Sequence, residues 1–327
     1  MLARFTGLTD PGRRRRRNED AYVCEPPLFA IADGMGGAQA GEVASGLAAA
    51  VLEEATGDER GEERVASLIQ EANRRVYRRS SEDAATSGMG TTMTVALVDD
   101  VDGTIAFGHV GDSRAYRVRG GELEQLTDDH SLVGELVRSG RLSPEEAESH
   151  PQRSVITRAL GTEPDVDVDT FTVEAEPGDV YLLCSDGLTD MVSPHEILAL
   201  VEAADDLEDA ARGLVNAANV GGGEDNITVV LFETDGSGGD AGETARVPAV
   251  AATDAPADVD DEDTLSPLDA VPAVDTAVIP AAAVEEHLRE ADSPPRRAEP
   301  RRRLLPLVLL IVLLLALVAL ALWGLTR

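Results

Sequence analysis

Four segments of this chain share one pattern, in which an apolar run suited to a buried strand meets an aspartate beside glycine or other small residues. They are LFAIADGMGG (28–37), IAFGHVGDSRAYRV (105–118), DVYLLCSDGL (179–188) and, with the acid before the strand, GGGEDNITVVLF (221–232). A single Asp-Gly pair is typical of a tight turn, because glycine accepts positive φ angles. Four such acids instead predict a scaffold of strands that brings several carboxylates to one end.

The four acids, Asp33, Asp112, Asp186 and Asp225, would repel one another at that end unless a cation lay among them. Their small neighbours would let the backbone and an ion approach closely. The five histidines and two cysteines of the chain show no metal-ligand spacing. Carboxylates without histidine or cysteine suit hard ions such as Mg²⁺ or Mn²⁺.

The segment DPGRRRRRNEDA (10–21) adds an acid pair, Glu19 and Asp20, after a run of five arginines, Arg13 to Arg17. Such a run is typical of a solvated patch, a nucleic-acid arm or a membrane-surface element. A guanidinium four residues before an acid of a metal site could also hold a phosphate through paired hydrogen bonds. Together with the carboxylates, this second interpretation favours a phosphorylated substrate.

The acidic balance of the chain argues against nucleic acid as a partner. Its 327 residues include 61 acids and 28 basic residues, all of them arginine, for a formal net charge of −33. Affinity for nucleic acid depends on neutralising phosphates, which so negative a protein does poorly. Cys24 and Cys184 lie far apart and are expected to be buried, reduced thiols of a cytosolic fold. The opening MLARFTGLTD lacks the apolar region of a signal peptide.

Residues 1–234 alternate strand-like runs, helical patterns and glycine-rich turns, which predicts one folded domain. The patterns predict helices over 40–55 and 63–79, a short helix in 141–150, two helices over 195–223 that break near Asp205, and a strand over 90–100. In the short helix Ser143, Pro144 and Glu146 form a capping box. Strand-like runs occur in hairpin-like pairs as well as beside helices, which predicts a layered α+β domain rather than a parallel, doubly wound sheet.

Two further segments follow this domain. Residues 235–303 are acidic, rich in Ala and Pro and without periodicity, which predicts an extended, disordered linker with a basic end. Residues 304–325, LLPLVLLIVLLLALVALALWGL, contain no charge and are long enough to cross a bilayer as one helix. Five arginines between positions 296 and 303 precede it. The positive-inside rule then predicts a single-pass protein of the cell membrane with its folded domain in the cytoplasm.

Six motifs in order make this chain resemble the protein phosphatase 2C family of metal-dependent serine/threonine phosphatases. They are G-x-x-R-x-x-N-E-D, A-D-G-M-G-G, G-M-G-T-T, H-V-G-D-S-R, C-S-D-G-L-x-D and G-G-x-E-D-N-I-T. The resemblance covers residues 1–233 and is greatest to bacterial members paired with membrane Ser/Thr kinases. It implies an α/β/β/α sandwich of two antiparallel sheets flanked by helices. It also implies hydrolysis of phosphoserine and phosphothreonine in proteins, opposed by a Ser/Thr protein kinase.

The resemblance further implies a role for single residues in a binuclear metal site. Asp33 matches the acid that bridges two metal ions, and the Gly34 carbonyl matches a further ligand. Asp186 and Asp225 match the other metal-binding acids. The implied reaction is attack of a metal-activated water on phosphorus.

Five other positions match residues around that pair of ions. Glu19 and Asp20 match residues that hold the water shell of the metals, and Arg15 matches the phosphate-binding arginine. Asp112 matches the ligand of a third ion in bacterial members. Ser154 lies in residues 131–160, which match a mobile flap, and matches a residue that can assist Asp112. The implied cofactors are two core ions, Mn²⁺ or Mg²⁺, and a weaker third.

One position departs from the eukaryotic members of the family. Met35 stands where they have a histidine proposed as general acid, so the leaving group must take its proton from water or another group. Two other interpretations remain open, namely a metal-dependent phosphatase of small phosphoesters and a catalytically dead phosphoprotein-binding module. Turnover of phosphopeptides and of free phosphometabolites would distinguish them.

Overall fold

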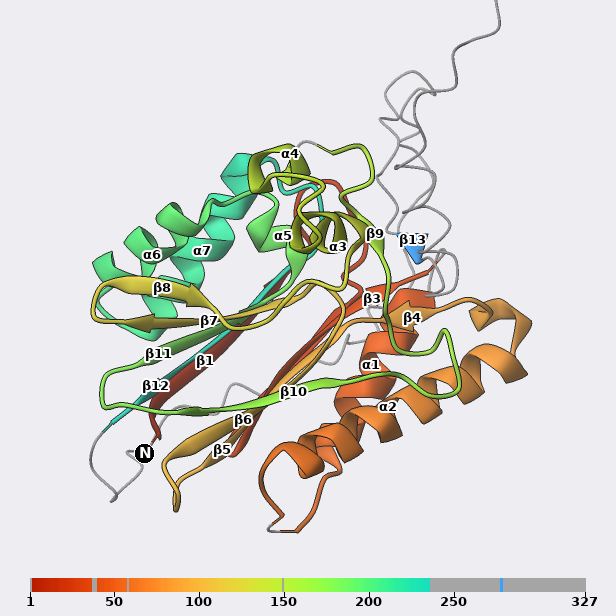
Figure 1. The fold of residues 1–327 in the computed structure, drawn as a ribbon, viewed down its shortest axis with the longest axis horizontal. Helices are drawn as coiled ribbons and strands as arrows, with labels where there is room; N and C mark the ends of the chain where they lie inside the picture. Colours follow the sequence, from red (N-terminus) through yellow and green to blue (C-terminus); the bar gives the residue numbers. More distant parts are fainter. Residues whose placement is uncertain (1, 37–39, 58, 149, 236–276, 279–327) are drawn as a thin grey trace, which may run out of the picture. The chain divides into compact units, whose positions relative to one another are not determined.

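The computed structural model describes residues 2–36, 40–57, 59–148, 150–235 and 277–278. Within residues 2–235 two antiparallel sheets lie face to face, and helices cover the outer face of each sheet (Figure 1). The layered α+β fold with two antiparallel sheets and flanking helices, predicted from the sequence, is confirmed.

The first sheet has five strands and the second has six. The order in the first is β1 (Leu2–Asp10), β12 (Ile227–Thr234), β11 (Val180–Cys184), β7 (Arg114–Arg119) and β8 (Glu122–Gln125). The order in the second is β10 (Asp169–Glu174), β6 (Thr104–Val110), β5 (Met93–Asp99), β3 (Leu28–Met35) and β2 (Asp20–Glu25), with β4 (Gly90–Thr91) beside β3.

The strand predicted over 90–100 is in fact two strands, β4 and β5, separated at Thr92. The Thr92 hydroxyl accepts a hydrogen bond from the Asp33 amide at 3.0 Å, and the Thr92 amide donates to the Asp33 carbonyl at 2.9 Å. Because Thr92 bonds to Asp33 through its side chain, the regular ladder is interrupted there. The interruption fixes the backbone of Asp33 from the neighbouring strand.

An aromatic layer fills the space between the two sheets. Phe232 of β12 stacks on Phe29 of β3, with ring centroids 4.4 Å apart, and on Tyr181 of β11 at 5.1 Å. All three side chains are fully buried. Inward-facing aromatic and β-branched residues of this kind favour strands, because they pack well on a pleated surface.

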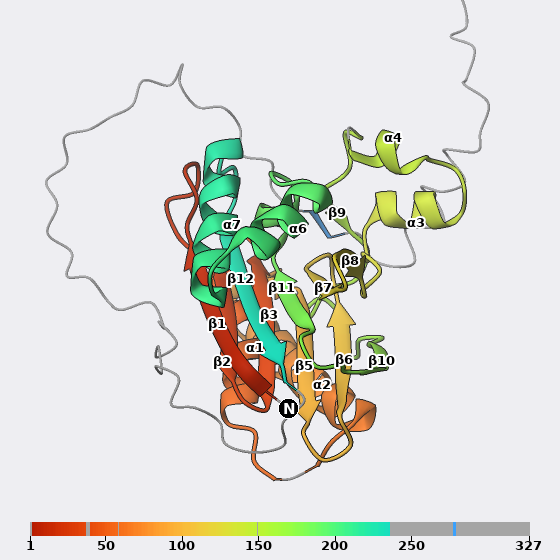
Figure 2. The same ribbon diagram turned by 90° about the vertical axis from the view of Figure 1, so that its left-hand side faces the viewer.

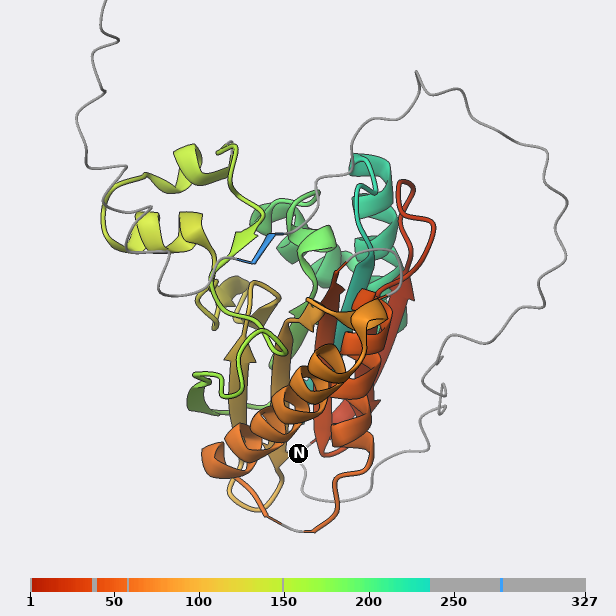
Figure 3. The ribbon, with the colours of Figure 1, turned by 90° about the vertical axis from the view of Figure 1, so that its right-hand side faces the viewer.

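Five helices cover the outer faces of the sheets (Figures 1 and 3). Two helices, α1 (Ala40–Glu53) and α2 (Glu62–Glu82), pack on the six-stranded sheet. The 3₁₀ turn η1 (Ala84–Thr86) follows α2. Helices α5 (Asp186–Thr189), α6 (Pro194–Ala203) and α7 (Leu207–Gly221) pack on the five-stranded sheet. Helix α2 approaches closely at Gly108 of β6, where a Cβ would lie 2.4 Å from Val65 Cγ1.

The helix boundaries follow the capping signals of the sequence. The break predicted near Asp205 is confirmed, since the Asp206 side chain accepts from the Asp209 amide and starts α7. The capping box predicted at Ser143 is also present. The Ser143 hydroxyl accepts from the Glu146 amide at 3.2 Å, and the Ser143 amide donates to the Glu146 carboxylate at 2.9 Å.

Residues 131–160, named the flap segment here, stand beyond one end of the sheets (Figure 2). They contain α3 (Leu132–Arg138), α4 (Pro144–Glu148) and β9 (Val155–Ile156). An antiparallel bridge joins Ser131 to Ile156 and so closes the base of the segment. The short strand β13 (Ala277–Val278) pairs with β9 in parallel.

The predicted membrane helix over 304–325 lies outside the described residues, as does the predicted linker except for 277–278. None of the helices within the described ranges has the length and apolar character needed to span a bilayer.

The aromatic layer generates a stability prediction. Phe232→Ala removes the ring between Phe29 and Tyr181 and leaves a cavity, which we expect to lower the free energy of unfolding by about 3–5 kcal/mol. Urea unfolding measures this change. Val101→Ala is the control, since Val101 is 93% exposed and its truncation should stay within about 0.5 kcal/mol. A cost below about 1 kcal/mol for Phe232→Ala would contradict the packing role.

Candidate metal centre

Strand ends from both sheets bring five aspartates to one place in the fold. Asp20 begins β2 and lies directly opposite Asp33 of β3 in the antiparallel register. Asp186 follows β11 as the first residue of α5, and Asp225 precedes β12. Asp112 lies in the connection from β6 to β7, where the chain passes from one sheet to the other.

Burial and mutual repulsion raise the pKa of Asp20, Asp33, Asp112 and Asp186. Burial raises the pKa of Asp33 well above its usual range, and the charges of Asp20, Asp186, Asp225 and Asp112 raise it further. Burial is also the main cause that raises the pKa of Asp20 to about 7. The pKa of Asp112 likewise rises to about 7, again mainly through burial. The influence of four charges on Asp33 shows that the structure gathers all five acids.

These acids fit a divalent cation by the chemistry of their oxygens. Asp20 Oδ1 and Asp186 Oδ1 are buried and have no hydrogen-bond partner among the described residues. An unsatisfied buried polar atom costs about 1–3 kcal/mol, which a cation would relieve. Within the described part of the chain, no three acidic, imidazole or thiol groups already surround one point closely enough to hold an ion. The case for a divalent cation therefore rests on the unpartnered carboxylate oxygens and on the repulsion between the aspartates. Oxygen ligands of this kind suit Mn²⁺ or Mg²⁺.

Gly34 is required for close backbone approach and not for a tight turn. Strand β3 continues through Gly34 to Met35 and pairs with β4, and the first positive φ occurs later, at Gly36 (138°). A Cβ on Gly34 would lie 2.2 Å from the Gly41 carbonyl oxygen. The Gly34 carbonyl oxygen and a Glu19 carboxylate oxygen lie together against Gly41, 2.8 Å and 2.6 Å from the position of a Cβ there. The predicted backbone ligand and a carboxylate predicted to hold the water shell thus stand side by side.

Arg15 lies in the β1–β2 connection beside the acids. Its Nη2 donates to Asp225 Oδ2 at 2.7 Å, and its Nε is buried without a hydrogen-bond partner in the described residues. Asn226 fixes this connection, since its Nδ2 donates to the Arg17 carbonyl at 2.9 Å and its Oδ1 accepts from the Glu19 amide at 2.8 Å. Arg15 is therefore held beside Asp225 while its buried Nε donor stays without a partner within the described ranges.

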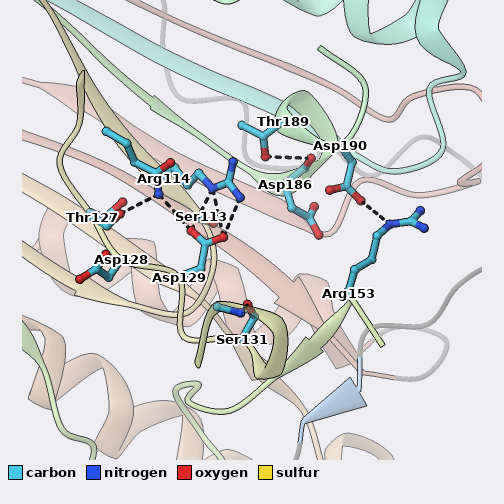
Figure 4. A network of polar contacts seen from close by, with 12 residues as sticks. Ser113, Arg114, Thr127, Asp128, Asp129, Ser131, Arg153, Asp186, Thr189 and Asp190 are labelled. Atoms are coloured by element: carbon cyan, nitrogen blue, oxygen red, sulfur yellow. Dashed lines mark hydrogen bonds and ion pairs between the residues drawn. The ribbon is translucent and has the colours of Figure 1, made fainter. Parts of the chain in front are cut away.

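The loop of Asp112 is bonded to the base of the flap segment. The Gly111 amide donates to His130 Nδ1 at 3.0 Å, and the His130 amide donates to the Gly111 carbonyl at 2.7 Å. On the other side, Arg114 pairs with both carboxylate oxygens of Asp129 (Figure 4), with Nη2 2.7 Å from Oδ2. These bonds fix Asp112 from the residues that flank it.

The flap segment approaches the acids through Arg153, which points toward Asp190 in Figure 4. Arg153 Nε lies 3.7 Å from Asp190 Oδ2, one turn of helix after Asp186. Ser154 is the next residue, but no hydrogen bond joins it to Asp112 or Asp186 in the part of the chain that the structure describes. Its predicted role at a third ion therefore stays a prediction.

Met35 connects the flap segment to the strand of Asp33. Its side chain is buried in a small cluster with Ile156 of β9 and Ala159. The position where a general-acid histidine could stand is thus an apolar contact in this protein.

Three residues at the centre were not assigned by the sequence analysis. Asn226 fixes the loop of Arg15, and Thr228 Oγ1 donates to Asp20 Oδ2 at 2.5 Å. Desolvation raises the pKa of Asp190, while the charge of Arg153 opposes that shift. All three residues belong to two of the motifs given above, E-D-N-I-T and C-S-D-G-L-x-D. Those motifs were the sequence feature that could have identified them as site residues.

Comparison with known proteins assigns this chain to a family. The sequence model of protein phosphatase 2C matches residues 13–218. The serine/threonine phosphatase stp of Listeria monocytogenes serotype 4b is 43% identical over 239 residues, which are 69% of this chain and 94% of that protein. Protein phosphatase PhpP of Streptococcus pneumoniae serotype 2 is 42% identical over 235 residues, 68% of this chain and 94% of that protein. The chain belongs to the protein phosphatase 2C family.

Solved structures agree with this assignment. The serine/threonine phosphatase PstP/Ppp of Mycobacterium tuberculosis superposes with a TM-score of 0.68 at 41% identity, over 72% of this chain and 100% of that chain. The catalytic domain of PstP in complex with two manganese ions superposes with a TM-score of 0.65 at 38% identity, over 72% of this chain and 99% of that chain. The matching catalytic chains correspond to the described domain.

The raised pKa values generate a prediction for the metal-free protein. Burial raises the pKa of Asp20 and of Asp112 from the ordinary value of 3.8 to about 7 in the folded state. A raised carboxyl pKa stabilises the fold fully below the unfolded pKa, and this contribution is lost as pH rises through the folded pKa. We therefore expect Mn²⁺ to raise the unfolding temperature more at pH 8 than at pH 5.5.

Differential scanning fluorimetry with EDTA or Mn²⁺ measures this difference. Asp112→Asn removes one of the titrating groups, so the metal-free variant should lose less stability between pH 4 and pH 7 than the parent chain does. An equal loss in both proteins would contradict the electrostatic account of Asp112.

Proposed function

We propose that this chain is a metal-dependent serine/threonine protein phosphatase that works at the acid cluster described above. The observation that supports this proposal most is the convergence of five mutually repelling aspartates, each at least partly buried, beside Arg15, in a chain of the protein phosphatase 2C family. The similar proteins from Listeria and Mycobacterium are named serine/threonine phosphatases. Phosphorylated proteins are the proposed substrates.

Asp33, the Gly34 carbonyl, Asp186 and Asp225 are the proposed ligands of two core ions, and Glu19 and Asp20 would hold their water shell. Divalent ions at this place supply a hydroxide nucleophile near neutral pH and offset the charge that develops on the phosphoryl oxygens. The manganese complex of PstP supports Mn²⁺ as the ion.

Arg15 is the proposed phosphate-binding residue. Its unused Nε donor and the Nη2 donor now on Asp225 form a fork that matches two phosphate oxygens. A phosphate oxygen that takes the place of the Asp225 carboxylate would leave that carboxylate free for a cation. The ion pair of Arg15 with Asp225 thus keeps both groups in position before substrate arrives.

Met35 has no proton to donate, so water is the proposed source of the proton for the leaving serine or threonine oxygen. Asp112 and Asp186, with Ser154 near them in the flap segment, are the proposed site of a third and weaker ion. Fewer charged ligands usually mean weaker binding of a hard ion.

The organisation of the whole chain is also part of the proposal. Residues 1–234 are the proposed catalytic domain, 235–303 a disordered linker and 304–325 a membrane helix, which would hold the domain on the cytoplasmic face of the cell membrane. The uncharged run and the arginines before it support this arrangement. A membrane Ser/Thr kinase would be the opposing partner.

Phosphate release from a phosphothreonine peptide by residues 1–234 tests the activity. We expect turnover that requires Mn²⁺ and that exceeds turnover of free phosphometabolites. Asp33→Asn, Asp186→Asn and Asp225→Asn should each reduce it about 100-fold or more, because each removes a charged metal ligand, while circular dichroism remains that of a folded protein. Near-normal turnover of any of these variants would contradict the assignment, and a preference for phosphometabolites would favour a phosphatase of small phosphoesters.

The arginine run allows a matched comparison. Arg15→Ala should lower kcat/KM roughly 10- to 100-fold, the value of one charged hydrogen bond to phosphate. Arg13→Ala should change little, since the Arg13 Nε donates only to the Asn219 carbonyl at 3.1 Å. Steady-state kinetics on one phosphopeptide compares the two variants. Equal effects on kcat/KM would favour the interpretation of the arginine run as a solvated patch.

Asp112→Ala tests the third ion. We expect two Mn²⁺ ions to remain bound, because Asp33 and Asp225 are intact, while phosphopeptide turnover falls roughly tenfold or more. Calorimetric counting of bound metal beside kinetics measures both quantities. Loss of all bound metal, or undiminished turnover, would each refute a separate third site.

A further inference from the structure

Two arginines beside Arg15 have no role in the site described so far. Arg14 and Arg16 are exposed, and neither side chain makes an ion pair or hydrogen bond within the described residues. The other members of the run are engaged. Arg15 bonds to Asp225, and Arg17 Nη1 lies 3.9 Å from a Glu42 carboxylate oxygen.

Unpaired arginines are notable in a domain with such an excess of acid. Residues 1–234 contain 45 acids and 20 arginines, so nearby carboxylates are abundant. Most arginines elsewhere in the domain pair with one. Arg114 pairs with Asp129, Arg119 with Asp179 and Arg158 with Asp169, for example, at 2.7, 2.5 and 2.6 Å. Two free guanidinium groups next to Arg15 therefore form a local positive region beside an acidic centre.

Backbone hydrogen bonds hold the start of the arginine run against the segment of Asp225. The Gly223 carbonyl accepts hydrogen bonds from the amides of Arg13 and Arg14, at 2.8 and 3.1 Å. A Cβ on Gly12 would lie 2.1 Å from the Asp225 carbonyl oxygen, so the loop packs tightly on the segment of that metal acid. Arg14 and Arg16 each lie one residue, about 3.8 Å along the backbone, from Arg15.

This placement matches the spacing of a peptide substrate. Residues of an extended peptide are spaced by about 3.3 Å, so side chains one to three positions from a bound phosphoresidue fall within about 10 Å of the phosphate. Long, flexible arginine side chains next to Arg15 can reach that zone. Free positive charge there attracts carboxylates and speeds their encounter, and salt weakens the effect.

We propose that Arg14 and Arg16 make this phosphatase prefer phosphoproteins with acidic residues next to the phosphorylated serine or threonine. The inference rests on the proposed phosphatase function and adds the substrate class. Acidic flanks would otherwise be disfavoured by the negative charge of the domain. The two arginines reverse that repulsion only where the peptide enters.

Kinetics of the full chain on three substrates tests the inference. One phosphothreonine peptide has Asp and Glu on both sides, the second has Asn and Gln at the same positions, and the third substrate is p-nitrophenyl phosphate, which has no flanks. We expect kcat/KM to be about three- to tenfold higher on the acidic peptide than on its amide counterpart, the range for two exposed charge pairs. Raising the salt concentration should reduce this ratio.

The double variant Arg14→Gln/Arg16→Gln should bring the ratio to about one and leave p-nitrophenyl phosphate turnover unchanged. Arg60→Gln/Arg78→Gln is the control, because it removes the same charge at two exposed positions, in the α1–α2 connection and on α2. It should keep the full ratio. Arg14→Lys/Arg16→Lys keeps the charge and should keep most of the preference.

Three results would overturn the inference. The first is that the unmodified chain shows no preference for the acidic peptide, and the second is that the preference survives Arg14→Gln/Arg16→Gln. The third is that this double variant loses turnover on all three substrates alike, which would indicate a structural role in placing Arg15. Turnover without acidic preference would overturn this inference alone. Absence of turnover on every phosphopeptide would overturn the phosphatase proposal and the inference with it.

Discussion

A carboxylate removed from water requires a proton or a cation beside it, and this requirement governs the end of the domain where Asp20, Asp33, Asp112, Asp186 and Asp225 meet. The register of the strands fixes where each acid stands. Asp20 cannot move away from Asp33 without a slip of β2 against β3, which would turn the buried side chains of β2 toward the opposite face. The fold therefore keeps a repulsion that protons relieve in acid and that cations relieve at neutral pH.

The layers of the fold and the positions of the acids could be predicted because local chemistry determines them. The helical period and the caps gave α1, α2, α6 and α7 to within a few residues. Asp33, Asp112, Asp186 and Asp225 were found because each stands beside an apolar run. The family resemblance supplied the sandwich of two sheets, and the comparisons confirm the family. The roles of the single site residues stay predictions.

What the sequence did not reveal depends on contacts between distant segments. Thr92 interrupts a strand because it bonds to Asp33, 59 positions earlier. The local sequence around Gly34 is typical of a turn, yet Gly34 lies in β3. A side chain there would collide with the backbone of α1, so the position requires glycine. Asn226 fixes a loop that lies 209 positions before it. No periodicity or propensity encodes such pairs, since they exist only once the sheets are assembled.

The pairing of β1 with β12 has a consequence for the synthesis of the protein. β12 lies between β1 and β11, and Asp225 just before it is the partner of Arg15, 210 positions earlier. A nascent chain that ends before residue 225 has already received Arg15 and four of the five aspartates, but β1 has no strand to pair with and the last acid is absent. The acid centre therefore cannot be complete before β12 has been synthesised. Incomplete chains contain most residues of the centre but lack the strand and the acid that complete it.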